Sequence, residues 1–182
     1  MSIGMKRGTV YLEDHRPEWE TAAAQTILTL KRVLRSDAAG VRHVGSTSIK
    51  TIPAKPIIDI AVGVHDYEAV LRKKDALEAE GIIFRFDERP GQLLFVMGDF
   101  ENDTRTHHIH VVLYGSKEWT DYVNFTDYLN ADAAAAEKYA ALKRELAEKY
   151  PNDRVAYTEG KSELISCLLT DAERWRSQTR AE

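Results

Sequence analysis

The run Ile57–Val62 constrains the fold of this chain more than any other segment. Five of its six residues are apolar, and only Asp59 interrupts the run. A nearly continuous apolar strand has to be covered on both faces, which places it inside a sheet with helices around it. A carboxylate there is costly to bury unless it is paired or binds a metal ion. Asp59 is therefore a candidate metal ligand, or a core carboxylate paired with Lys55, Arg42 or a histidine.

Hydrophobic periodicity predicts the remaining elements. Residues 9–12 form a short strand or an extended arm. We expect strands over residues 41–44, 56–64, 82–86, 93–97 and 109–113, the last three as an antiparallel meander with a turn at Pro90-Gly91. We expect helices over residues 17–34, 66–80, 117–130, 132–149 and 153–177, with Val155 on the inner side of the last one. The outcome is an α+β fold in one domain over residues 1–182, with a mixed sheet of about five strands flanked by helices and a helical C-terminal third.

Composition narrows the class of protein. With 182 residues, 43% hydrophobic content and a formal net charge of −4, the chain does not have the excess of Lys and Arg that general nucleic-acid binding needs. No apolar run approaches a membrane span, and the first ten residues lack the apolar segment of a secretory signal. We therefore expect a cytoplasmic protein with no membrane partner. The single cysteine, Cys167, lies in an apolar run and is expected to be a buried, inert thiol.

A turn rich in small and hydroxylated residues, Gly45-Ser46-Thr47, follows the first predicted strand of the sheet. Backbone N–H groups and hydroxyls in such a turn can hold phosphate oxygens. The alternative is a tight turn in which Ser46 only caps the next helix. A phosphate-binding turn beside a metal-binding carboxylate on the next strand is the layout of a nucleotidyl-transfer site.

Histidines alternate along a later strand, so that His108 and His110 share one face and His107 lies on the other. Two imidazoles on one face can bind a transition metal or phosphate, act as general acid and base, or form a structural pair. A two-metal site would need a second acid at the alternate position of the Asp59 strand, whereas that position is Ala61. We expect Asp66, beyond the strand, to cap the next helix.

Six ordered segments extend this pattern over most of the chain. They are His43-Val-Gly-Ser-Thr-Ser48, Ala54-Lys-Pro-Ile-Ile-Asp-Ile60, His108-Ile-His-Val-Val112, Phe125-x-Asp-Tyr-Leu129, Tyr139-x-x-Leu-Lys143 and Tyr157-x-x-x-Lys161. Together they resemble the GrpB family, which is placed by fold in the nucleotidyltransferase superfamily and is attached to dephospho-coenzyme A kinase in some bacteria. The chain departs from the family after the Gly-Ser turn, where Ile49–Ile52 replaces Val-Pro-Gly-Leu, and at Thr126, where arginine is usual.

The resemblance implies a nucleotidyltransferase-like fold and a site for a nucleoside triphosphate or another phosphorylated small molecule. The expected nucleotide-binding residues are Gly45, Ser46, Thr47, Lys55, Tyr157 and Lys161. The expected catalytic and metal-binding residues are Asp59, His108 and His110, with Mg²⁺ or Mn²⁺ as the divalent metal. Lys143 is interpreted as a solvated surface lysine, and Asp127 as a partner of a basic residue or a histidine.

Three functions follow from this set of residues. The first is metal-dependent nucleotidyl transfer to an unknown acceptor. The second is a nucleotide or phosphometabolite binding module without turnover, which Ala61 favours. The third is a transition-metal-dependent hydrolase that uses the histidine strand.

Overall fold

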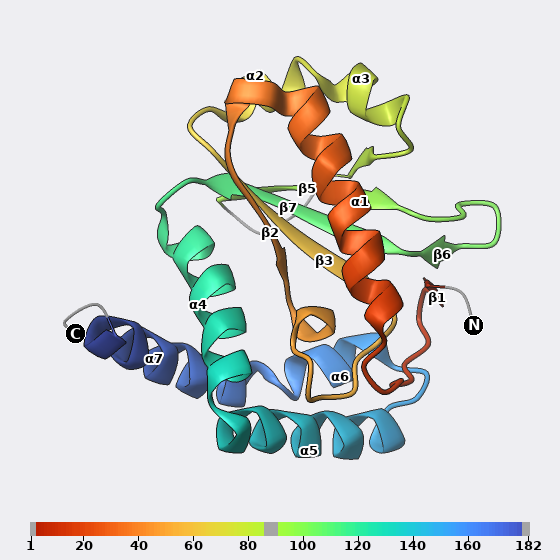
Figure 1. Cartoon of the computed structure of the whole chain (residues 1–182). Coiled ribbons are helices and arrows are strands. Elements are labelled where there is room, and N and C mark those ends of the chain that lie inside the picture. Colours follow the sequence, from red (N-terminus) through yellow and green to blue (C-terminus); the bar gives the residue numbers. More distant parts are fainter. Residues whose placement is uncertain (1–2, 86–90, 180–182) are drawn as a thin grey trace.

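The computed structural model describes residues 3–85 and 91–179 of the chain. Five strands form a mixed sheet in the order β2-β3-β7-β5-β4 (Figure 1). Strands β3 and β7 are parallel, and the other neighbours are antiparallel. The strands are β1 (Met5–Lys6), β2 (Ala38–Val44), β3 (Ile58–Val64), β4 (Ile83–Arg85), β5 (Gln92–Met97), β6 (Thr104–Arg105) and β7 (His107–Leu113). The α-helices are α1 (Pro17–Leu34), α2 (Tyr67–Leu71), α3 (Lys74–Glu78), α4 (Lys117–Ala131), α5 (Ala133–Lys149), α6 (Arg154–Glu159) and α7 (Ser162–Thr179).

Helix α1 covers one face of the sheet and crosses β2 and β3 (Figure 1). Its buried side chains include Trp19, Ala23 and Leu30, at the spacing that puts them on one side of a helix. They belong to one core cluster with Ile58 and Ile60 of β3. Alternate residues of β3 and β7 therefore build the main core on the α1 face, and the residues between them point to the other face.

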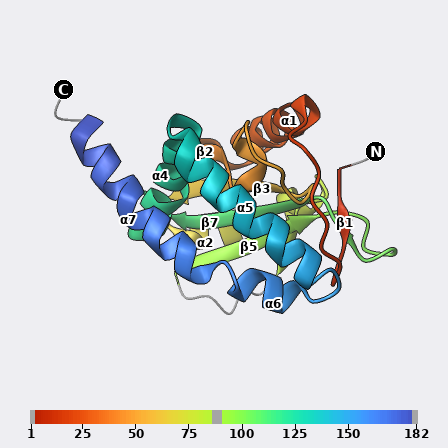
Figure 2. The ribbon, with the colours of Figure 1, turned by 90° about the horizontal axis from the view of Figure 1, so that it is seen from below.

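Helix α4 packs on that other face against β2, β3 and β7. The approach is close, because a Cβ on Gly40 or Gly63 would lie 2.7 Å from a ring atom of Trp119 or Tyr114. Seen from below, α5 runs across the lower end of the sheet, with α6 and α7 beside it (Figure 2). These C-terminal helices enclose the ends of β3 and β7 opposite α1.

Several sequence predictions are confirmed. The Asp66 side chain accepts a hydrogen bond from the Glu68 backbone N–H and so caps the start of α2, as expected. Strands β4, β5 and β7 form the expected antiparallel meander. Residues 9–12 are an extended arm that is not part of a strand. Residue 86 of the predicted strand 82–86 and Pro90 of the predicted turn lie outside the described residues.

Two helix predictions were wrong. The segment 66–80 forms two short helices, α2 and α3, rather than one. The segment 153–177 also divides, at Gly160, where a Cβ would lie 2.7 Å from Leu146 Cδ2 on α5. Helix α6 is thus a separate short helix, and Val155 on it is 66% exposed instead of facing inward. In the described part of the chain, no helix has both the length and the apolar character to cross a bilayer.

Candidate functional site

Asp59 and Gly45 meet at the end of β2 that lies beside β3. Val44 pairs with Asp59 in the β2–β3 register, so the turn begins directly next to the carboxylate. Gly45 has φ +71°, and a Cβ there would lie 2.7 Å from Asp59 Oδ2. Only glycine combines this left-handed conformation with such a close approach. The turn then continues as a single 3₁₀ turn, Ser46–Ser48, in which the Ser48 hydroxyl donates to the Gly45 carbonyl over 2.6 Å.

Two histidines of β7 hold the same oxygen of Asp59. His108 Nδ1 lies 3.4 Å and His110 Nε2 3.3 Å from Asp59 Oδ1. Burial by itself raises the pKa of Asp59, but the hydrogen bonds from His108 and His110 outweigh it and hold this pKa well below its usual range. His110 is fixed further by stacking on Tyr122 of α4, with ring centroids 5.0 Å apart. Of the structural partners considered for Asp59, the histidines are therefore the ones it has.

His107 points to the opposite face, as the alternation predicts. It is 8% exposed, and its Nε2 lies 3.2 Å from the Thr26 hydroxyl of α1. Burial lowers the pKa of His107 to about 4. His107 thus belongs to the core, and only His108 and His110 face the candidate site.

A cavity of about 980 Å³ opens over Asp59. Its walls combine the strand ends with α4, α5, α6 and Lys161 between α6 and α7. The predicted site residues among them are Gly45, Ser46, Lys55, Asp59, His108, His110, Tyr157 and Lys161. A smaller pocket of about 310 Å³ shares Gly45, Tyr122 and Phe125 with this cavity.

Thr47 is the predicted phosphate-binding residue that does not line the cavity. It is 1% exposed, and its hydroxyl lies 3.0 Å from His43 Nε2. Ser46 instead faces the cavity and hydrogen-bonds to Tyr139 of α5. Burial raises the pKa of Tyr139 to about 12, so this phenol stays protonated and can donate.

Cations gather around the Tyr157 ring at the α6 end of the cavity. The Lys161 and Lys55 ammonium groups lie 4.3 Å and 5.2 Å from its centroid. Burial, followed by the repulsion of neighbouring cations, lowers the pKa of each lysine to about 8. Within the described residues, neither ammonium group has a carboxylate at ion-pair distance. Lys161 lies after the end of α6, yet it still faces the same ring as predicted from its spacing to Tyr157.

Lys143 corrects the sequence interpretation. It was expected on the solvated surface of its helix, whereas it is 1% exposed on the inner side of α5. Its Nζ lies 4.9 Å from the Tyr139 ring centroid and has no hydrogen-bond partner within the described residues. Burial, together with Lys161 and Lys55, lowers the pKa of Lys143 well below its usual value. The missed signal was its position: Tyr139, Lys143 and Leu146 follow one another at helical spacing on the buried side of α5.

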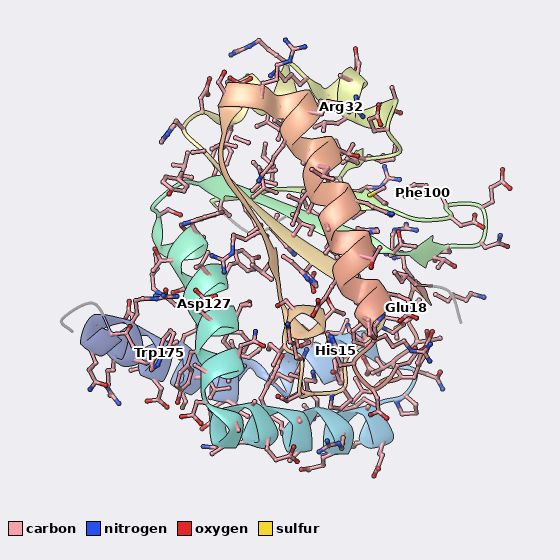
Figure 3. All side chains as sticks on the ribbon, in the orientation of Figure 1. His15, Glu18, Arg32, Phe100, Asp127 and Trp175 are labelled. Carbon is pink, nitrogen blue, oxygen red and sulfur yellow. The ribbon has the colours of Figure 1, made fainter. Side chains whose placement is uncertain are left out.

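Two further expectations concern residues outside the cavity. Asp127, labelled on α4 in Figure 3, does orient basic residues. It pairs with Arg42 of β2 at 2.7 Å and with Arg176 of α7. These two ion pairs connect α4 with both the sheet and the last helix.

Cys167 was expected to be buried but is exposed, since α7 packs through Leu168 and Ala172.

The residues around Asp59 do not fit a two-metal centre. Such a centre needs at least two acids, and Ala61 occupies the alternate position of β3, opposite His110. Asp59 Oδ1 already takes both histidines, while Oδ2 faces Gly45. Among the described residues, no group of three His, Cys, Asp or Glu side chains is arranged to hold a metal ion. The structure thus brings the three predicted metal ligands together as a hydrogen-bonded cluster.

The fold is that of the nucleotidyltransferases. The structure superposes on the Cid1 poly(U) polymerase, solved with MgGTP bound, with a TM-score of 0.52 and 18% identity over 75% of this chain and 44% of that chain. A cytoplasmic RNA terminal U-transferase matches with a TM-score of 0.51 and the same identity and coverage of this chain. At this identity, the likeness shows a shared fold.

The chain belongs to the GrpB family, whose model, described as GrpB protein, matches residues 9–171. The glutamate-rich protein GrpB of Alkalihalophilus pseudofirmus is 34% identical over 93% of this chain and 99% of its own length. The crystal structure of the conserved protein GrpB from Enterococcus faecalis has a TM-score of 0.82 and 28% identity, covering 91% of this chain and 99% of that one. A dephospho-CoA kinase of Mycolicibacterium paratuberculosis is 26% identical over 95% of this chain, which spans 48% of that protein.

Proposed function

We propose that the cavity over Asp59 binds a nucleoside triphosphate or a closely related phosphorylated small molecule. The observation that carries this proposal is the composition of its walls. Lys55 and Lys161 face the cavity without carboxylate partners in the described structure, and Gly45 and Ser46 form a small turn across from them. Its volume of about 980 Å³ is at the upper end of the range usual for small-molecule sites.

Different residues of the cavity wall have different roles in the proposed binding. The ammonium groups of Lys55 and Lys161 offset the charge of the phosphates, which they can approach closely because water is largely excluded from them. The Ser46 hydroxyl adds a hydrogen-bonding group at the turn. Asp59 is itself held by His108 and His110, so part of its charge is already balanced before an anion approaches. This arrangement favours binding of an anionic ligand close to a carboxylate.

Binding without turnover is the form of the proposal that the donor atoms favour, because Ala61 leaves Asp59 as the one acid at this end of β3. Metal-dependent nucleotidyl transfer is the second candidate. It is supported by the fold, and by the position of Asp59 beside the Gly-Ser turn. The polymerase and U-transferase activities belong to the matched structures, and for this chain nucleotidyl transfer is a proposal.

A ligand screen tests both candidates. Thermal unfolding would be followed with ATP, CTP, GTP, UTP and coenzyme A precursors, each with and without Mg²⁺ or Mn²⁺. A ligand at 100 times its Kd adds about 2.7 kcal/mol to the free energy of unfolding, which is readily measured. We expect a nucleotide-dependent shift that Lys55→Met reduces. The matched control is Lys138→Met, because Lys138 is exposed on the outer side of α5.

The outcomes separate the candidates. A shift with no release of pyrophosphate in the presence of either metal supports the binding module. Metal-dependent release of pyrophosphate supports transfer. If no nucleotide or precursor shifts the transition, or if Lys55→Met and Lys138→Met behave alike, the cavity does not bind this class of ligand in the proposed way.

A further inference from the structure

The buried ammonium group of Lys143 lies behind the cavity wall. It has no hydrogen-bond partner in the described residues and is 1% exposed. A buried lysine without a partner is costly in its charged form, so it is either neutral or paired with something that enters the site. The charges of Lys161 and Lys55 act on Lys143, and both of these lysines line the cavity.

Three lysines thus converge on one end of the cavity from three segments. Lys55 precedes β3, Lys143 lies on α5, and Lys161 lies between α6 and α7. Lys55 and Lys161 lie against the Tyr157 ring and Lys143 against the Tyr139 ring, with each Nζ 4.3–5.2 Å from a ring centroid. Protein carboxylates do not pair with any of the three within the described structure. The ammonium groups are thus spread over two rings, and a chain of phosphates can bring negative charge near more of them than a single phosphate can.

We propose that Lys55, Lys143 and Lys161 form a subsite for the end of a polyphosphate chain, which selects ligands with two or more linked phosphates over a single phosphate. Lys55 and Lys161 contact the phosphates from the wall. Lys143 supplies a further positive charge from behind Tyr139 once the anion is in place. The inference deepens the proposed function and rests on it, since it concerns the phosphate end of the same ligand.

The charged groups around these lysines make binding detectable through protons. Burial and mutual repulsion lower the pKa of Lys55 and Lys161 to about 8, so an incoming anion favours their protonated forms. The surrounding groups are Asp59 on β3, Tyr139 and Arg144 on α5, Arg154, Tyr157 and Glu159 on α6. Binding of a polyphosphate near pH 8 is therefore expected to take up protons.

The test uses inorganic phosphate, pyrophosphate and tripolyphosphate, which carry no base. Calorimetric titrations of the intact chain near pH 8, in two buffers with different ionisation enthalpies, give the affinity and the proton uptake together. We expect affinity to rise about tenfold with each added phosphate, the size expected for one more charge-assisted contact. Lys143→Met is expected to reduce both this rise and the proton uptake, whereas Lys138→Met, on the exposed side of the same helix, leaves both unchanged.

Folding of the variant is checked by cooperative thermal unfolding. Methionine removes an unpaired buried ammonium group, so Lys143→Met is expected to be at least as stable as the parent chain. If it does not fold, Lys161→Met, at the cavity wall, provides the same test of phosphate-number selectivity. Equal affinity for phosphate and tripolyphosphate, or identical titrations for Lys143→Met and Lys138→Met, would overturn the inference.

The two proposals fail differently. If tripolyphosphate binds through the lysines but no nucleotide or precursor does, the subsite stands and the proposed function fails. If nucleotides bind with the same affinity whatever their number of phosphates, the proposed function stands and the subsite fails. If neither class binds, both are wrong.

Discussion

The two faces of β3 and β7 differ sharply although they alternate residue by residue. On the α1 face, Ile58 and Ile60 are fully buried, and His107 is held by Thr26. On the other face, the Asp59 side chain is 29% exposed beside the cavity, and its carboxylate contacts His108 and His110. One strand therefore serves as core and as site at once, because a period of two separates the two sets of side chains. Stability should depend mainly on the first face and ligand binding on the second.

Ile60→Ala is expected to give the largest effect on the core face. Removal of buried methyl and methylene groups in a closely packed sheet costs about 2–5 kcal/mol. Urea unfolding would measure this loss. Ligand affinity, measured well below the transition, should not change, because Ile60 points away from the cavity. A large loss of affinity in a folded Ile60→Ala chain would show that the two faces are not separable.

The dependence of stability on pH distinguishes the faces next. The pKa of His107 is lowered by burial to about 4, against about 6.5 in the unfolded chain. The unfolded state then binds more protons, so stabilisation present above pH 6.5 is lost as the pH falls toward 4, by at most about 3 kcal/mol. Burial also lowers the pKa of His43 to about 4. Because the two histidines contribute similar losses that add, denaturation of His107→Gln at several pH values should remove about half of the combined loss and leave the contribution of His43.

Asp59 acts in a different pH range from the histidines of the core face. Its pKa is held below the usual value, so its stabilisation is complete above about pH 4 and is lost only at lower pH. Asp59→Asn should accordingly leave the loss between pH 6.5 and 4 in place. If Asp59→Asn removes that loss instead, the assignment of the two ranges to the two faces is wrong.

The sequence could predict the strand pattern because periodicity acts locally. The alternation of His107, His108 and His110, and the carboxylate within an apolar run, are both visible without the fold. Lys143 was missed because an alanine-rich helix has a weak apolar stripe, and the buried position of a lysine depends on what packs against it. The break at Gly160 was also missed; Gly160 packs closely against Leu146 of a separate helix, and local spacing does not show such a contact. Features such as the burial of Lys143 therefore depend on contacts between helices that are distant in sequence, which local patterns do not show.

Gly45→Ala is expected to have an intermediate effect on the free energy of unfolding, because Gly45 lies in the turn after β2, directly beside Asp59. Alanine at φ +71° costs about 1–2 kcal/mol, and its Cβ would lie 2.7 Å from Asp59 Oδ2. Gly81→Ala is the matched control, because Gly81 has φ +76° and a Cβ there would meet nothing within 4 Å. Thermal unfolding should show the larger loss for Gly45→Ala. Only this variant should also weaken nucleotide binding, and equal affinities for both would separate the turn from the ligand.

Val155→Ser is expected to have the smallest effect on stability. Unlike Ile60→Ala, it should leave the free energy of unfolding nearly unchanged and weaken ligand binding. Val155 is 66% exposed at the cavity wall, so its loss should change the free energy of unfolding by less than about 0.5 kcal/mol. A ligand that covers this side chain would lose some apolar contact, which corresponds to an affinity about threefold lower. Leu28→Ser on α1, at 67% exposure, should leave both quantities unchanged. If both serine variants bind equally well, the ligand does not extend over α6 and is held at the lysines and the Gly45 turn alone.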